Sequence, residues 1–185
     1  MDIARTPATP DGNPVMADAA IEPKAPPVIR REDYTPFPWL ILATRMEFEL
    51  GLKKTRITTT LNVERNPDAA ASPTIRLNGD GLALVSLACD GGSCDGHMID
   101  GDDLVVTLPG DRHVLTIVTE LAPSDNSQLM GLYASNGMLC TQCEAEGFRR
   151  ITFFPDRPDV LSTYTVRMSG PRAQFPVLLC NGNRT

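Results

Sequence analysis

The chain of 185 residues is 42% hydrophobic and 22% charged, which is the composition of an ordinary globular protein with a buried core. Its net charge of −6 is unfavourable for contact with phosphate backbones, so we expect no nucleic-acid partner. The sequence has no run of about 18 apolar residues, and we therefore expect no membrane-spanning helix.

Residues 1–33 form a segment of unusual composition, rich in Pro, Ala and Asp and without a hydrophobic period. Such a segment buries too little apolar surface to offset the entropy lost on ordering. We therefore expect a disordered leader, followed by one folded domain over residues 34–185.

The cysteine count bears on the compartment. Five cysteines are an odd number, which argues against a complete set of intramolecular disulfides and is typical of a reducing compartment. The first residues also lack the apolar stretch of a secretory signal. Together these features predict a cytoplasmic protein.

From Trp39 onward, apolar and polar residues alternate with the period of two that is typical of strands. In the first two predicted strands, the residues expected on one face are Met46, Phe48 and Leu50, and then Ile57, Thr59, Leu61 and Val63. Further strands are expected at residues 74–77, 82–89, 104–108 and 113–121, and in the segments RITFF, STYTVRM and FPVLLC. Turn sequences such as NGDG and LPGDR separate them.

Short strands with regular turns and no long helical period predict an all-β fold, with two sheets arranged as a sandwich or a saddle. The sequence ends in LLCNGNRT, where a predicted strand and turn have no partner after them. We therefore expect the domain to be incomplete at its C-terminal end, because an unpaired strand edge promotes aggregation.

The segment CTQCEAEGFRR, residues 140–150, offers two kinds of site. Cys140 and Cys143 have the spacing of a zinc knuckle, and Cys89 with Cys94 could complete a structural zinc site. A lone C-x-x-C is a weak signal, however, and Cys89 ends an apolar strand, where a free cysteine behaves as a small hydrophobic residue. A zinc-stapled structural domain is thus one hypothesis.

The second kind of site uses the polar residues of the same segment. Gln142, Glu144 and Glu146 follow a period of two, so an extended segment would direct them to one side. A carboxylate together with an amide oxygen makes a good receptor for an ammonium group. The alternative is a solvated strand face with Arg149 as counter-ion, and the residues by themselves leave both open.

Residues 131–183 contain, in order, the segments TQCEAEGFRRIT, PDRPDVLSTYTV and LLCNGN. In these segments the chain resembles the N-terminal domain of bacterial aminopeptidase N enzymes, which are zinc metallopeptidases of the M1 family. Weaker similarity extends back to about Asp33. The resemblance implies a saddle-like two-sheet β-sandwich that packs on a thermolysin-like catalytic domain, absent from this chain, and closes one side of its active site.

By this resemblance, Gln142 and Glu144 match the positions that bind the free α-amino group at the peptide N-terminus of the substrate. A carboxylate at this point favours peptide ends over internal segments, which lack the charge. Glu146 has no implied substrate role, and we expect it to hold the segment through salt bridges together with Arg149 and Arg150.

The sequence departs from the family in lacking the His-Glu-x-x-His zinc motif, since Met98 follows His97 and Val114 follows His113. We therefore expect zinc only in a full-length parent enzyme, which removes N-terminal amino acids in peptide catabolism. We expect this chain alone to bind no metal and to lack peptidase activity. The alternatives are a stand-alone β-sandwich interaction module and the zinc-stapled domain named above.

Overall fold

The computed structural model describes residue 28 and residues 30–184. The chain divides into two units, residues 1–34 and residues 35–185. In the first unit the structure describes a 3-10 helix, η1 (Arg31–Asp33). Residues 1–27 and 29 lie outside the described residues, so the disordered leader stays a prediction.

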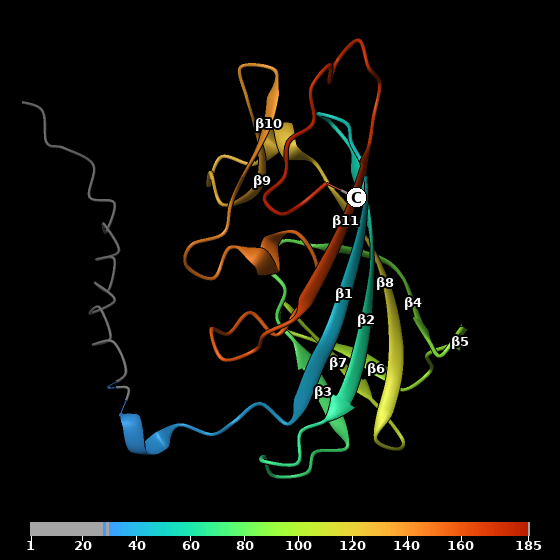
Figure 1. Cartoon of the computed structure of the whole chain (residues 1–185), viewed down its shortest axis with the longest axis vertical. Coiled ribbons are helices and arrows are strands. Elements are labelled where there is room, and N and C mark those ends of the chain that lie inside the picture. The colour runs from blue at the N-terminus through green and yellow to red at the C-terminus, as the bar shows by residue number, and fades with distance from the viewer. Residues whose placement is uncertain (1–27, 29, 185) are drawn as a thin grey trace, which may run out of the picture. The chain divides into compact units, whose positions relative to one another are not determined.

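The second unit contains a six-stranded sheet built on the segments with a period of two (Figure 1). Its order is β11-β1-β2-β8-β4-β5, and only the β1–β11 pair is parallel. The bounds are β1 (Trp39–Glu49), β2 (Thr55–Arg65), β4 (Ala83–Cys89), β5 (Gly92–Ser93), β8 (Arg112–Leu121) and β11 (Thr163–Ser169).

Two smaller sheets complete the second unit. A three-stranded sheet of order β3-β7-β6 is formed by β3 (Thr74–Leu77), β6 (His97–Asp100) and β7 (Asp103–Thr107). A hairpin is formed by β9 (Gly131–Ser135) and β10 (Met138–Gln142), and lies near the upper end of β1 in Figure 1. Two further 3-10 helices are η2 (Pro123–Asp125) and η3 (Phe148–Arg150). In the described part of the chain, no helix is long and apolar enough to cross a membrane.

The alternating side chains bury two apolar clusters. The larger joins the six-stranded and three-stranded sheets and includes Trp39, Leu61, Ile75, Leu104, Leu115 and Phe153. The smaller packs the hairpin and the start of the following segment onto β1 and β2, through Met46, Ile57, Leu132 and Ile151. Burial of each such side chain contributes about 1.5–3 kcal/mol. The predicted all-β, sandwich-like fold is confirmed.

Two predicted strands are wrong. Residues 151–154 form no strand, apart from a single bridge between Asn78 and Phe154, because their apolar side chains fill both clusters around an irregular segment. The segment FPVLLC forms none either: Phe175 is buried, whereas Val177 and Leu179 are exposed.

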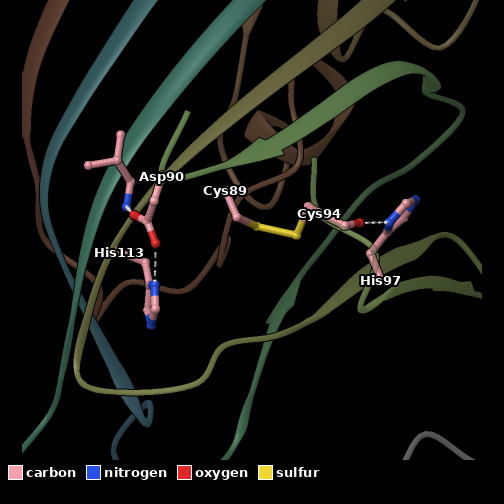
Figure 2. Close-up of a disulfide and its surroundings, with 6 residues drawn as sticks. Cys89, Asp90, Cys94, His97 and His113 are labelled. Atoms are coloured by element: carbon pink, nitrogen blue, oxygen red, sulfur yellow. Dashed lines mark hydrogen bonds and ion pairs between the residues drawn. A yellow bond between two sulfur atoms is a disulfide. The ribbon is translucent and has the colours of Figure 1, made fainter. Parts of the chain in front are cut away.

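The structure also corrects the interpretation of the cysteines. Cys89 and Cys94 form a disulfide, so Cys89 is neither a free thiol nor a zinc ligand (Figure 2). This pairing contradicts the four-cysteine zinc hypothesis. Cys140, Cys143 and Cys180 are free, in keeping with an incomplete disulfide set. The cytoplasmic location stays a prediction.

Both histidines are hydrogen-bonded to residues of the loop that the disulfide closes. The Nδ1 of His113 on β8 is 2.8 Å from the Asp90 carboxylate, and that of His97 on β6 is 2.6 Å from the carbonyl oxygen of Cys94 (Figure 2). The hydrogen bond to His113, together with one from the Val114 N–H, lowers the pKa of Asp90. Both histidines lie on strands and serve local structure.

We predict a modest destabilisation when this disulfide is reduced. The bridged residues are five positions apart, and closing so short a loop is worth about 2 kcal/mol. Urea unfolding with and without dithiothreitol measures the difference. A Cys89→Ser/Cys94→Ser variant should have the same free energy of unfolding as the reduced chain, and dithiothreitol should not change it. A loss below about 0.5 kcal/mol in both would contradict the prediction.

Candidate functional site

Gln142 and Glu144 lie where the β9–β10 hairpin ends. Gln142 is the last residue of β10 and pairs with Gly131. The chain then turns, and the Gly147 N–H donates a hydrogen bond to the Cys143 carbonyl oxygen at 2.9 Å. We call residues 142–147 the anchor turn. The extended segment expected here is wrong, because the chain turns after Gln142 and Glu146 has a φ of 64°.

Both predicted residues are exposed on the anchor turn. The Gln142 amide nitrogen donates to the carbonyl oxygen of Glu144 at 3.1 Å, which leaves the amide oxygen as its available acceptor. Among the described residues, the Glu144 carboxylate has no hydrogen-bond or ion-pair partner. The Glu144–Ala145 peptide bond is cis. The turn thus presents a carboxylate and an amide oxygen that are not used internally.

Two glycines allow η3 to pack closely on the anchor turn. A Cβ atom on Gly131 would lie 2.5 Å from the Cβ of Arg150, and Gly131 also has a φ of +72°. A Cβ atom on Gly147 would lie 2.6 Å from the Gln142 carbonyl oxygen and 2.7 Å from the Cys143 Cα. Real side chains do not tolerate such contacts, so both positions require glycine. The sequence reasoning missed these two residues.

Salt bridges hold the C-terminal side of the turn, as predicted for Glu146. Its carboxylate lies 3.4 Å from the Arg149 guanidinium, and Arg149 Nε lies 3.1 Å from the carboxylate of Asp156. Arg150 pairs with Asp80 at 2.5 Å. The expected salt bridge of Glu146 is formed with Arg149, whereas Arg150 pairs with Asp80 and not with Glu146.

Cys143 forms the inner side of the anchor turn. Its side chain is half-buried and belongs to the smaller apolar cluster. Burial raises the pKa of the Cys143 thiol, and the Asp156 carboxylate raises it further. Below the turn, Phe148 contacts the rings of Phe154 and Tyr164 edge-on, at centroid distances of 5.0 and 6.0 Å. Burial raises the pKa of Tyr164, and the nearby Asp156 and Cys143 raise it further. The underside of the turn is thus apolar, and its outer side is polar.

The chain offers no set of ligands for zinc within its described part. Across residue 28 and residues 30–184, no three or more His, Cys, Asp or Glu side chains gather closely enough to hold a metal ion. The described residues therefore do not fit a zinc site.

Comparison with known proteins decides the family. A sequence model described as the peptidase M1 N-terminal domain matches residues 43–185. The chain belongs to this family. This M1 N-terminal domain is 46% identical over 160 residues to aminopeptidase N of Caulobacter vibrioides, which covers 85% of the chain and 18% of the relative. It is 38% identical over 154 residues to aminopeptidase N of Escherichia coli, which covers 83% of the chain and 18% of that relative.

Solved structures agree with this assignment. Aminopeptidase A of Legionella pneumophila, in complex with aspartic acid, superposes with a TM-score of 0.76 at 28% identity, over 82% of this chain and 18% of that chain. An M1 zinc metallopeptidase variant from Deinococcus radiodurans, bound to a Tyr-Ser-Ala substrate, shares the fold with a TM-score of 0.61 at 19% identity, over 72% of this chain and 33% of that chain.

The resemblance read from the segment TQCEAEGFRRIT is confirmed. The chain is an N-terminal domain of the M1 aminopeptidases, which are zinc-dependent peptidases. It spans about 18% of the length of the relatives from Caulobacter and Escherichia. The activity of a complete enzyme is therefore a matter for proposal.

Proposed function

We propose that this M1 N-terminal domain anchors the peptide substrate of a zinc-dependent aminopeptidase, with Gln142 and Glu144 binding the α-ammonium group. The observation that carries the proposal is the pair of exposed acceptors on the anchor turn, neither of which has a partner among the described residues. An α-ammonium group has three N–H donors, and it matches a carboxylate and an amide oxygen in both charge and hydrogen bonding.

This assignment explains how such an enzyme selects the end of a peptide. An internal peptide nitrogen carries no charge and donates one hydrogen bond, so the Glu144 carboxylate would lose its water without gaining an ionic partner. The α-ammonium group of a peptide end provides the Glu144 carboxylate with both a positive charge and hydrogen-bond donors. In this proposal the domain works against a catalytic domain outside the chain, which supplies zinc to polarise the scissile carbonyl, and the enzyme acts on peptides in the cytoplasm.

The test uses a chimera in which residues 43–185 replace the matching segment of the Caulobacter vibrioides aminopeptidase N. Two inhibitors are compared, a phosphinic dipeptide analogue with a free amino group and the same compound without it. Charged hydrogen bonds are worth about 1.5–3 kcal/mol, so the amino compound should bind roughly 10- to 150-fold more tightly.

In a Gln142→Ala/Glu144→Ala variant of the chimera, the preference for the amino compound should fall to within about threefold, because both acceptors are gone. The compound without the amino group serves as the internal control, and its affinity should change little. The proposal is wrong if the variant keeps the full preference.

A further inference from the structure

We propose that Arg149 is a positioning residue that holds the anchor turn in its binding geometry by fixing it to the three-stranded sheet. This inference rests on the proposed function of Gln142 and Glu144 for its effect on substrate. The effect on the turn itself follows from contacts within this chain.

Arg149 is bound to one residue through three separate donors. Its backbone N–H and its Nε both donate to the same carboxylate oxygen of Asp156 at 3.1 Å, and its terminal NH2 donates to the Asp156 carbonyl oxygen at 3.2 Å. The side chains of Arg149 and Asp156 are only 23% and 15% exposed. A planar guanidinium group with charge-assisted hydrogen bonds is suited to this arrangement, whereas lysine offers only a point charge.

Asp156 is in turn fixed to the segment that follows β3. Its backbone N–H donates to the side-chain oxygen of Asn78 at 3.2 Å, and the Asn78 amide donates to Asp103 on β7 at 3.3 Å. On the same side, the Asp80 N–H donates to the Arg149 carbonyl oxygen at 3.0 Å. Both the backbone and the side chain of Arg149 are therefore tied to the three-stranded sheet.

The other side of Arg149 faces the anchor turn. Its guanidinium contacts the Glu146 carboxylate at 3.4 Å, two residues after Glu144. The Arg150 N–H also donates to the Gly147 carbonyl oxygen at 3.1 Å, which joins η3 to the end of the turn. Glu144 itself lies in the exposed part of the turn and has no partner among the described residues. Its position therefore depends on how firmly the C-terminal side of the turn is held.

Cys143 provides a direct readout of this positioning. It lies inside the anchor turn, half-buried, between the two proposed binding residues. Alkylation requires the thiolate, so burial makes the thiol slow to react. If the turn becomes less firmly held, the Cys143 side chain becomes more exposed to solvent and should react faster. Removing a positive charge by itself can only disfavour the thiolate, so a faster reaction cannot come from the lost charge of Arg149.

The first experiment measures iodoacetamide alkylation of Cys143 in the 185-residue chain, with Cys140→Ser and Cys180→Ser introduced to silence the other free thiols. Arg149→Met should raise the rate at pH 8 about tenfold, because the half-buried thiol of Cys143 becomes accessible to the reagent. Arg45→Met is the matched control, since Arg45 is an exposed arginine that pairs with Glu47 on its own strand, and it should leave the rate unchanged.

Arg149→Lys should react at an intermediate rate, because lysine restores the charge without the fork of donors. Far-UV circular dichroism establishes that each variant is folded, and the lysine variant decides the question if the methionine variant is not. Unchanged alkylation in the folded variants would overturn the positioning proposal.

The second experiment uses the chimera defined above and a peptide substrate with a free N-terminus. Arg149→Met should raise KM about tenfold with a smaller change in kcat, and should add less than about twofold when Glu144→Gln is already present. Full additivity would overturn the proposal. If instead Glu144→Gln leaves the kinetics unchanged while Arg149→Met still speeds alkylation, the proposed function fails and the positioning of the turn stands.

Discussion

Replacement of Glu144 by glutamine is expected to lower kcat/KM of the chimera about 100-fold for peptides with a free N-terminus. Glutamine keeps the size of the side chain and one acceptor oxygen, but it removes the charge that the α-ammonium group meets. A charge-assisted hydrogen bond is worth about 1.5–3 kcal/mol, which corresponds to roughly 10- to 150-fold. Steady-state kinetics with an amino-acid anilide measures the loss.

The matched control for Glu144→Gln is Glu47→Gln. Glu47 is also a glutamate at the surface, but it lies on β1 and pairs with Arg45 at 2.7 Å. An exposed pair of this kind contributes at most about 1 kcal/mol to stability. Among the described residues, the Glu47 carboxylate pairs with Arg45 and forms no hydrogen bond or ion pair with the anchor turn. The control should keep kcat/KM within about twofold. Equal activity of the two variants would contradict the role of Glu144.

The second large effect concerns the core. Trp39→Ala should lower the free energy of unfolding of the chain by about 4 kcal/mol, as large-to-small changes of buried aromatic residues do. Trp39 is 1% exposed, and its indole N–H donates to the Thr74 carbonyl oxygen at 3.0 Å. The Arg65 guanidinium also lies 4.0 Å from the ring centroid. The substitution leaves a cavity where β1 meets the three-stranded sheet. It also leaves the Thr74 carbonyl oxygen without its donor and removes the aromatic ring that Arg65 packs on.

Urea unfolding followed by far-UV circular dichroism measures this change, since Trp39 is the single tryptophan and its fluorescence is lost in the variant. Leu40→Ala is the control, because the next side chain along β1 is 38% exposed and should cost less than about 1 kcal/mol. Trp39→Phe separates the indole hydrogen bond from the ring packing and should cost about 2 kcal/mol. A loss below about 1 kcal/mol for Trp39→Ala would contradict the packing assigned to this residue.

The two effects concern different parts of the domain. The larger cluster around Trp39 holds the six-stranded sheet against the three-stranded sheet. Asn78, which directly follows β3, accepts a hydrogen bond from the Asp156 N–H, and the Asp156 carboxylate in turn binds Arg149. The anchor turn is thus a polar surface feature placed by a framework of buried apolar residues and partly buried ion pairs. A binding group on a turn needs such support, because its own backbone makes few contacts.

The sequence by itself determined the class of fold and the candidate residues. The alternation of Ile57, Leu61 and Val63 places one face of β2 in the core, because a strand exposes successive side chains on opposite faces. The segment TQCEAEGFRRIT indicated the family, and through it Gln142 and Glu144. It also indicated the salt bridge between Glu146 and Arg149, whose charges lie three positions apart, whereas Arg150 pairs with the distant Asp80.

Only the tertiary structure decided the conformation in which these residues are held. The period of two suggested an extended segment through Glu146, but the chain turns, because Gly147 approaches Cys143 and packing against η3 outweighs local strand preference. Ile151 and Phe153 have strand-forming residue types and form no strand, because each fills a buried cluster. The pairing of Cys89 with Cys94 and the link from Asn78 to Asp156 join residues whose approach depends on the folded chain. Such contacts leave no periodic signal in the sequence, because they depend on how the strands and the segments between them come together.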